Sequence, residues 1–240
     1  MKILLTILAA AFCFVTQTNA QLDPENLTRS LASSDRPSAD LERDANRKAP
    51  EVLSFLGLNE GMTALDLIAI GGWYTEVLAI AVGPSGQVIM QNNPGRMVDN
   101  NIELINSRLS RRANINHHLG PVSDLSADSI DFALTALNFH DVYNRSAEEA
   151  HDRFTQVYNA LKPGGIFGVI DHQGSAGADN ASLHRIAFED AVKSITAMGF
   201  ALTGTSDLLD NPADDHTLGP RDPSLARNTD RFILRFVKPE

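Results

Sequence analysis

The second half of the sequence holds three short polar motifs that contain histidine. Two of them place the imidazole next to a carboxylate, and the third places it next to a guanidinium. An imidazole beside a carboxylate is the common arrangement of a general base with a tuned pKa, and it also supplies metal ligands where cysteine is absent. The candidate catalytic residues are therefore His140, Asp141, Asp171, His172, His184 and Arg185.

A second candidate site follows an apolar run that ends near residue 70. Asp66 lies inside this run, and Gly71 and Gly72 stand directly before a stretch with helical character. Glycines let a ligand approach the backbone closely, and an acid orients hydrogen-bond donors, so the combination suits a nucleotide-like ligand. A tight turn between a strand and a helix also requires glycine, so this motif alone leaves both interpretations open.

The elements that must position these residues alternate between apolar runs and helical segments from residue 61 onward. This alternation predicts a parallel sheet with helices on both faces, that is, an α/β fold with a doubly wound seven-stranded sheet. Ligands bind outside the carboxyl ends of the strands in such sheets, where the histidine motifs and the glycine pair are expected to meet. The expected strands cover residues 62–70, 87–91, 113–117, 129–136, 166–170, 200–205 and 231–237, and the expected helices cover 73–82, 97–109, 148–161 and 183–198.

The first sixty residues lack a strand pattern. Lys2, the apolar run Ile3–Val15 and the small-residue site Thr18–Ala20 predict a secretory signal peptide over residues 1–20. We expect residues 21–60 to form a helical extension with one or two cap helices, and residues 61–240 to form the α/β domain. The only cysteine, Cys13, leaves with the signal. The expected product is a periplasmic or secreted protein without disulfides.

Composition narrows the range of partners. Of 240 residues, 43% are hydrophobic, 30 are acidic and 20 are basic, which gives a formal net charge of −10. Nucleic acids and anionic membranes attract basic surfaces, so neither is an expected partner, and a small molecule is the expected ligand. The apolar run at the N-terminus is also shorter than the roughly 20 residues that span a bilayer.

Several motifs together resemble those of class I S-adenosylmethionine-dependent methyltransferases. They are the acid and glycine pair between residues 66 and 72, Leu161–Gly165 before the fifth strand, and the final strand hairpin. More narrowly, residues 40–239 look like a family of exported bacterial proteins that are predicted to be methyltransferases. The narrower resemblance is carried by Gly71–Glu76, Asn138–Asp141, Asp171–His172, Leu183–Arg185 and Pro212–Thr217.

The resemblance implies S-adenosylmethionine as the cofactor. In this fold the glycine-rich turn holds the methionine portion, an acid at the end of strand two binds the ribose, and an acid after strand three often binds the adenine. Here Ile68 and Ile70 occupy two of the usual glycine positions, so the glycine loop is degenerate. An amide stands at the ribose position, and Pro121 falls near the adenine position with Asp124 as the nearest acid. The implied cofactor-binding residues are Asp66, Gly71, Gly72, Tyr74, Asn92 and Asn138.

The leading hypothesis is methyl transfer from S-adenosylmethionine to a small acceptor, with His140 or Asp171 as the base. One alternative is a metal-assisted hydrolase or lyase that uses the histidine and acid rim, and another is a non-catalytic binding protein. Asp215 and His216, in the long polar connection after residue 206, are expected to close over the rim. A shared site requires four side chains to converge to within about 10 Å, namely those of His140, Asp171, His172 and His184.

Overall fold

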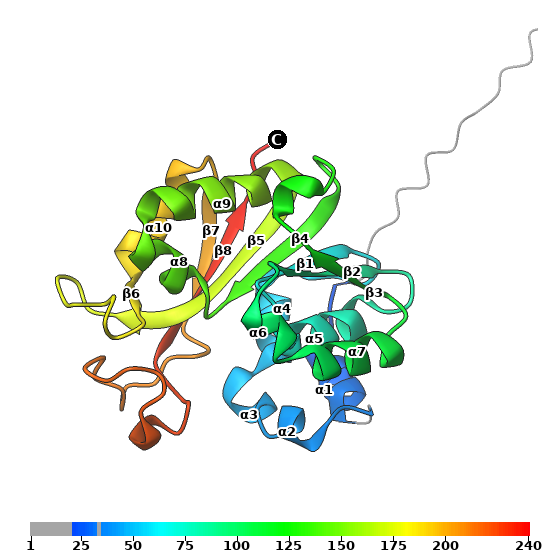
Figure 1. The fold of residues 1–240 in the computed structure, drawn as a ribbon, viewed down its shortest axis with the longest axis horizontal. Coiled ribbons are helices and arrows are strands. Elements are labelled where there is room, and N and C mark those ends of the chain that lie inside the picture. Colours follow the sequence, from blue (N-terminus) through cyan, green and yellow to red (C-terminus); the bar gives the residue numbers. More distant parts are fainter. Residues whose placement is uncertain (1–20, 33–34) are drawn as a thin grey trace, which may run out of the picture.

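The computed structural model describes residues 21–32 and 35–240. Its centre is one sheet in the order β3-β2-β1-β4-β5-β8-β7, with a short β6 paired to the end of β5 (Figure 1). Strands β1 to β5 are parallel, and β8 is antiparallel to both neighbours. The predicted doubly wound α/β sheet of seven strands is confirmed. The strands are β1 Thr63–Leu67, β2 Gln87–Asn92, β3 Ile115–Leu119, β4 Ile130–Ala136, β5 Leu161–Gly174, β6 Ile186–Ala187, β7 Ala201–Ser206 and β8 Arg231–Val237.

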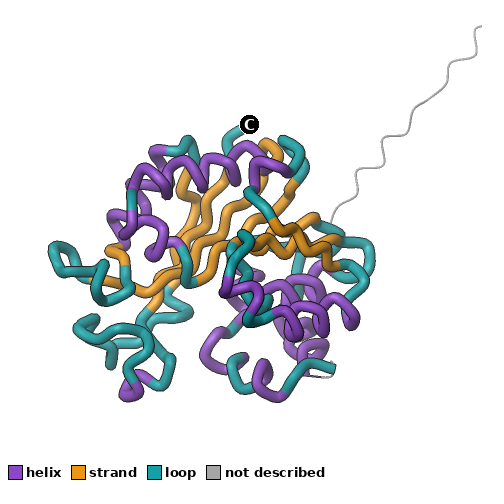
Figure 2. The backbone as a smooth tube through the Cα atoms, viewed as in Figure 1, coloured by secondary structure: helices purple, strands orange, loops and turns teal. Residues whose placement is uncertain are grey.

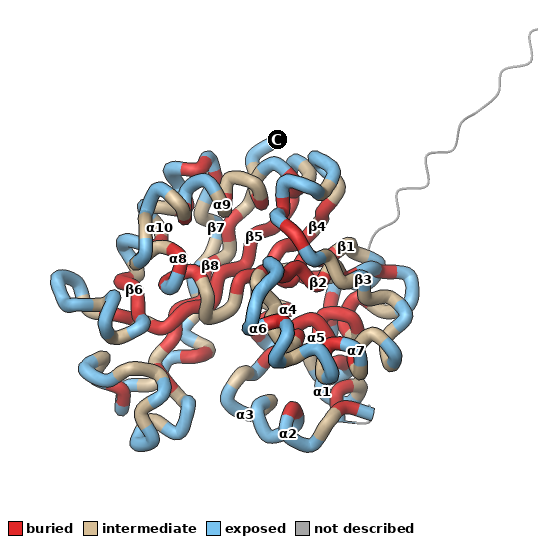
Figure 3. The backbone as a smooth tube through the Cα atoms, in the orientation of Figure 1, coloured by how far each residue is buried: buried red, intermediate tan, exposed pale blue. Residues whose placement is uncertain are grey.

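Helices cover both faces of the sheet (Figure 2). Side chains of a strand alternate between the faces, so Ala64 packs in one buried cluster with α4 and α5, whereas Leu65 packs in another with α9 and α10. Figure 3 shows the central strands buried between the two helix layers, whose outer sides are exposed, whereas the edge strands β3 and β7 are only partly covered. The helices are α1 Pro24–Ala32, α2 Ser38–Leu41, α3 Asp44–Arg47, α4 Ala49–Leu56, α5 Trp73–Val82, α6 Arg96–Asp99, α7 Ile102–Arg111, α8 Phe139–Arg145, α9 Ala147–Ala160 and α10 Phe188–Ala197, with 3-10 turns at Val122–Asp124 and Pro223–Leu225.

The N-terminal extension packs onto the sheet through α4. Val52 and Leu53 are fully buried in the same cluster as Phe132 of β4. Pro50 lies in the first turn of α4, where its missing N–H costs no hydrogen bond, and Gly57 ends the helix with φ 87°. Residues 21–32 and 35–60, the described part of the extension, contain four helices where the sequence predicted one or two, because α2 and α3 are single turns that are too short to show a hydrophobic period.

Two predicted helices have different bounds in the structure. The helix expected over residues 97–109 is divided into α6 and α7 at Asn101, whose φ of −115° leaves the helical region. The helix expected from residue 183 begins at Phe188, because His184 has φ 51° and the next residues pair with β5 as β6. Neither α8 nor β6 was predicted, since seven and two residues respectively are too few to show a period.

The predicted signal peptide over residues 1–20 lies outside the described residues. The described chain starts with Gln21, which forms an isolated bridge with Asn59 in the loop before β1. Within residues 21–32 and 35–240, no helix is long and apolar enough to cross a bilayer.

Candidate active site

The loop after β1 keeps the backbone shape of a glycine-rich turn although two isoleucines stand in it. Ile68 and Ile70 both have φ 52°, and Gly72 has φ 72°. Left-handed backbone costs an L-residue roughly 1 to 2 kcal/mol. In the neighbouring loop after β4, Leu137 has φ 63°. Strain of this kind persists only where surrounding contacts impose it, and it concentrates at ligand sites.

Polar side chains from β2 and the start of α8 hold this loop. Asn92 Oδ1 accepts from the N–H of Ile70 at 2.7 Å, and Asn92 Nδ2 donates to the carbonyl of Ile70 at 3.3 Å. Gln91 accepts from the N–H of Ile68, and Asn138 donates to the carbonyl of Ile68. Asn92 is therefore buried beneath the loop, where its amide supports the backbone.

A cavity of about 300 Å³ opens above this loop, at the carboxyl ends of β1 and β4. These two strands are neighbours at the position where the strand order reverses, which is the expected ligand site of a doubly wound sheet. Asn92 does not line the cavity. The other five of the six predicted cofactor residues do line it, namely Asp66, Gly71, Gly72, Tyr74 and Asn138.

The glycine pair is closely packed and also lines the cavity. A Cβ atom on Gly72 would lie 2.6 Å from the Met90 side chain of β2, and one on Gly71 would lie 2.9 Å from the Leu104 side chain of α7. The glycines form a tight turn from strand to helix and also line the cavity, and the interpretation as a ligand-binding motif stays a prediction.

Asp66 brings a buried carboxylate to the cavity wall. It is 3% exposed, and its Oδ2 accepts a hydrogen bond from Thr75 Oγ1 at 2.5 Å. Burial raises the pKa of Asp66 to about 6, against the lowering effect of the Thr75 hydrogen bonds and of the Arg47 charge. A titratable group that is perturbed by burial and lines a cavity is a typical component of a functional site.

Arginines from the N-terminal extension form the opposite wall. Arg43 and Arg47 line the cavity, and the Arg47 guanidinium lies over the Trp73 ring at 4.4 Å from its centroid. Within the described part of the chain, no carboxylate forms a salt bridge with either guanidinium. By contrast, Arg108 also lines the cavity but is neutralised by Glu76 and Asp40. The cavity therefore presents two cationic groups opposite one carboxylate.

A second cavity of about 300 Å³ adjoins the first, and Leu137 lines both. Residues 219–222 of the long connection before β8 form its other wall. The predicted convergence of the histidine motifs is borne out by geometry, because the His140 ring centroid lies 5.5 Å from that of His172 and 6.0 Å from that of His184. The predicted catalytic residues that line this cavity are His140, Asp141, His172 and His184.

Four of the side chains form a continuous chain of hydrogen bonds and ion pairs. His140 Nδ1 bonds to Asp171 Oδ1 at 2.6 Å, and the His140 N–H of the backbone donates to Asp171 Oδ2 at 2.8 Å. On the other side of the ring, His140 Nε2 lies 3.2 Å from Asp141 Oδ1. The same carboxylate oxygen is 2.8 Å from His184 Nδ1. The order from the interior to the solvent is thus Asp171, His140, Asp141, His184.

The two buried imidazoles have opposite charge states. Burial opposes the charged form of His140, but the carboxylates of Asp171 and Asp141 outweigh burial and raise its pKa to about 10. Burial lowers the pKa of His172 to about 3, and its Nδ1 bonds to Thr229 Oγ1 at 2.6 Å. At neutral pH His140 is a cation and His172 is neutral. His140 lies between two carboxylates and Asp171 is fully buried, and the role of either as the base stays a prediction.

Arg185 lies behind the cavity wall and has a supporting position. Its guanidinium is fully buried and donates to both carboxylate oxygens of Asp214, to the carbonyl of Gln173 and to the carbonyl of Leu218. These bonds tie the long connection before β8 to β5. Because its donor groups are occupied, Arg185 is not placed to contact a ligand in this cavity.

The connection before β8 does cover the histidine cavity, but through other residues than expected. His216 is turned away from the cavity and bonds to Asp230 at 2.8 Å, and Asp215 caps its own turn through Thr217. Arg221 and Asp222 line the cavity instead. Sequence reasoning also missed Arg43 and Arg47, which line the first cavity. Their spacing of four residues is typical of one face of a helix, but it does not indicate that this face lines a cavity.

Comparison with known proteins defines the fold class. No protein-family model matches the sequence, and no curated protein matches it either. Solved structures do match: a SAM-dependent methyltransferase from Aquifex aeolicus has a TM-score of 0.62 at 20% identity, covering 90% of this chain and 98% of the other. An S-adenosylmethionine-dependent methyltransferase from Mesorhizobium loti has a TM-score of 0.56 at 15% identity, covering 80% and 97%. The [4+2]-cyclase SpnF has a TM-score of 0.58 at 20% identity, covering 90% and 92%.

The chain therefore has the class I methyltransferase fold. At identities of 20% and below, the likeness establishes the fold and leaves the activity to be argued from the site.

Proposed function

We propose that this protein is an S-adenosylmethionine-dependent methyltransferase that acts on a small oxygen or nitrogen acceptor. The observation that carries the proposal is the pair of adjoining cavities at the switch point of the sheet. One is lined by five of the six residues predicted to bind the cofactor, and the other by four of the six predicted catalytic residues. Their common wall at Leu137 brings a donor and an acceptor site next to each other.

The charges of the first cavity fit the amino-acid end of S-adenosylmethionine. Arg43 and Arg47 are cationic partners for a carboxylate, and Asp66 is an anionic partner for an ammonium group. The bound cofactor would supply an electrophilic methyl group. The protein's part is alignment, because methyl transfer requires mainly that the acceptor atom is held in line with that group.

The nucleoside end has a partial match. A further cavity of about 420 Å³ is lined by Gln91 at the end of β2, Asn93 after β2 and Pro121 after β3, the region where the fold places nucleoside contacts. Among the described residues, Ile68 is the one that lines both this cavity and the first. An isoleucine at this shared position places a bulky side chain at both cavities where a glycine would leave room, so we expect weaker cofactor binding than a glycine would allow.

In the acceptor cavity, His184 is the residue placed to take a proton. Asp141 binds its Nδ1 and so fixes the orientation of the ring, as the carboxylate does in a catalytic Asp–His pair. Its side chain is half-exposed and lines the cavity, so a bound acceptor can reach the other nitrogen. His140, as a cation between two carboxylates, fixes Asp141 in this position.

The test is calorimetric titration of the metal-free protein with S-adenosylmethionine, followed by S-adenosylhomocysteine release on a panel of small phenols, amines and carboxylates. Arg47→Met removes a cation from the cavity and should weaken binding at least tenfold, which is about 1.4 kcal/mol. Arg29→Met, on the exposed face of α1, is the matched control and should leave binding unchanged. Absence of binding at millimolar cofactor, or equal effects of the two variants, would refute the proposal.

A further inference from the structure

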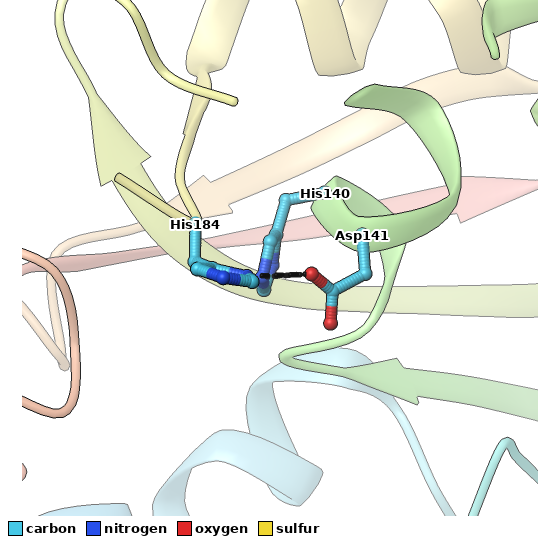
Figure 4. Close-up of side chains that lie close together, drawn as sticks. All are labelled: His140, Asp141 and His184. Atoms are coloured by element: carbon cyan, nitrogen blue, oxygen red, sulfur yellow. Dashed lines mark hydrogen bonds and ion pairs between the residues drawn. The ribbon is translucent and has the colours of Figure 1, made fainter. Parts of the chain in front are cut away.

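We propose that His140, Asp141 and His184 form a binding site for a divalent transition-metal ion, with Zn²⁺ as the reference ion. Each residue offers one nitrogen or oxygen, and these three atoms lie within 4.8 Å of one another. Figure 4 shows the three side chains directed toward a common point, two from the first turn of α8 and one from the turn before β6.

The distances suit a single ion. Zinc binds imidazole nitrogen and carboxylate oxygen at about 2.0 to 2.2 Å, so two ligand atoms on one ion lie roughly 3.0 to 3.5 Å apart. Asp141 Oδ1 lies 3.2 Å from His140 Nε2 and 2.8 Å from His184 Nδ1. All three ligand atoms lie within 4.8 Å of one another, so side-chain rotations that move an imidazole nitrogen by about 1 Å bring them to bonding distance around one ion.

The surroundings of His140 are those of a metal ligand. Asp171 accepts the hydrogen of His140 Nδ1, and Nε2 faces the Asp141 carboxylate. The space between this nitrogen and the carboxylate oxygen already favours a positive charge, and a bound metal ion would replace the proton of Nε2 there. Metal-binding histidines commonly have such a carboxylate on the second nitrogen, and it fixes the ring orientation.

The third ligand is held by a rigid turn. His184 has φ 51°, and the adjacent Arg185 is anchored by its bonds to Asp214, Gln173 and Leu218. The backbone of His184 is thereby fixed against β5, although its side chain is half-exposed. This explains why a left-handed conformation is maintained at a residue whose side chain faces the cavity.

The donor set indicates the kind of ion. Two imidazoles and one carboxylate suit borderline divalent ions such as Zn²⁺ and Fe²⁺, whereas Ca²⁺ and Mg²⁺ require mostly oxygen ligands. Three protein ligands leave further coordination positions, and these face the cavity that Arg221 and Asp222 close. An oxygen or nitrogen atom of a small molecule in the cavity is the ligand that would occupy them. The inference rests on protein side chains alone and does not depend on the proposed methyl transfer. An ion on His184 Nδ1 would leave the ring proton on Nε2, so His184 would accept a proton only in the metal-free protein.

The experiment is titration of the chelator-treated, purified protein with Zn²⁺ by calorimetry, and with Co²⁺ by visible absorption. We expect one ion per chain and the absorption bands of Co²⁺ bound to nitrogen. His184→Ala and Asp141→Asn should each weaken binding by at least a hundredfold. Asp171→Asn should weaken it by about 10- to 100-fold, as is usual for the partner of a ligand. The matched control is His151→Ala, an exposed histidine on α9.

The inference fails if Zn²⁺ does not bind, or if His151→Ala weakens binding as much as His184→Ala does. Circular dichroism and thermal unfolding of each variant exclude loss of fold as the cause. Cofactor titrations of the metal-free protein are separate, so loss of the metal site and loss of the proposed methyltransferase activity are distinguishable. Cofactor binding without metal binding would refute only the metal site. Metal binding without cofactor binding would refute only the proposed function.

Discussion

Replacement of the buried carboxylate of Asp66 by an amide should stabilise the protein at neutral pH and weaken ligand binding. In the unfolded chain this carboxyl has a pKa of 3.8, and burial raises it to about 6 in the folded state. Between these values the folded protein still holds a proton that the unfolded chain has released. The contribution of Asp66 to stability is therefore highest below pH 4, and it declines as the pH rises from 4 to 6.

The size of this decline follows from the shift in pKa. A shift from 3.8 to about 6 corresponds to about 3 kcal/mol at 1.36 kcal/mol per unit, and the loss is complete above pH 7. Asp66→Asn keeps an oxygen that accepts from Thr75 but never ionises. At pH 8 the variant should therefore exceed the wild type in free energy of unfolding by up to about 3 kcal/mol, and below pH 4 the two should be nearly equal.

The assay is urea unfolding at pH 4, 5, 6 and 8, followed by the fluorescence of Trp73, the only tryptophan. With a slope of about 2 kcal/mol per molar urea, the difference at pH 8 is a midpoint shift of roughly 1 to 1.5 M. Asp152→Asn, at an exposed position of α9, is the control and should show no pH-dependent difference. A difference between Asp66→Asn and wild type that is constant from pH 4 to 8, or that grows toward acid pH, would refute the reasoning.

Two further substitutions and one mass measurement test other parts of the reasoning. Ile68→Gly should tighten S-adenosylmethionine binding about tenfold in calorimetry. Glycine relieves the left-handed strain and removes the side chain that lines both cavities. Ile68→Val, the control, should not tighten binding. Arg185→Met should lower the free energy of unfolding by about 3 to 5 kcal/mol, measured by urea unfolding, since it leaves Asp214 buried without its partner. A loss below about 1 kcal/mol would contradict the supporting role of Arg185. Mass spectrometry of the protein from its native compartment should show a chain that begins at Gln21, and a mature chain that begins at Met1 would disprove the predicted export.

The sequence was sufficient to predict the sheet and the edge at which the site lies. The alternation of apolar runs with helical segments is a consequence of burial on both faces, and it depends on residues that are near one another in the chain. The helix over Trp73–Val82 has the predicted bounds, because Gly72 and Gly83 mark both of its ends. Since the carboxyl ends of parallel strands share one edge, the approach of His140 to His172 was also predictable.

Tertiary structure alone decided which way the polar side chains of the site are directed. Asn92 is turned to the backbone of Ile70, and Arg185 is turned inward to Asp214, because each satisfies a buried polar group on an element distant in sequence. Arg43 and Arg47 reach the cavity only through the docking of the N-terminal helices. The charge state of His140 likewise depends on two carboxylates that surround a buried ring, and one of them, Asp171, comes from β5 rather than from α8. Side-chain direction and charge state follow from long-range packing and desolvation, which local sequence patterns do not record.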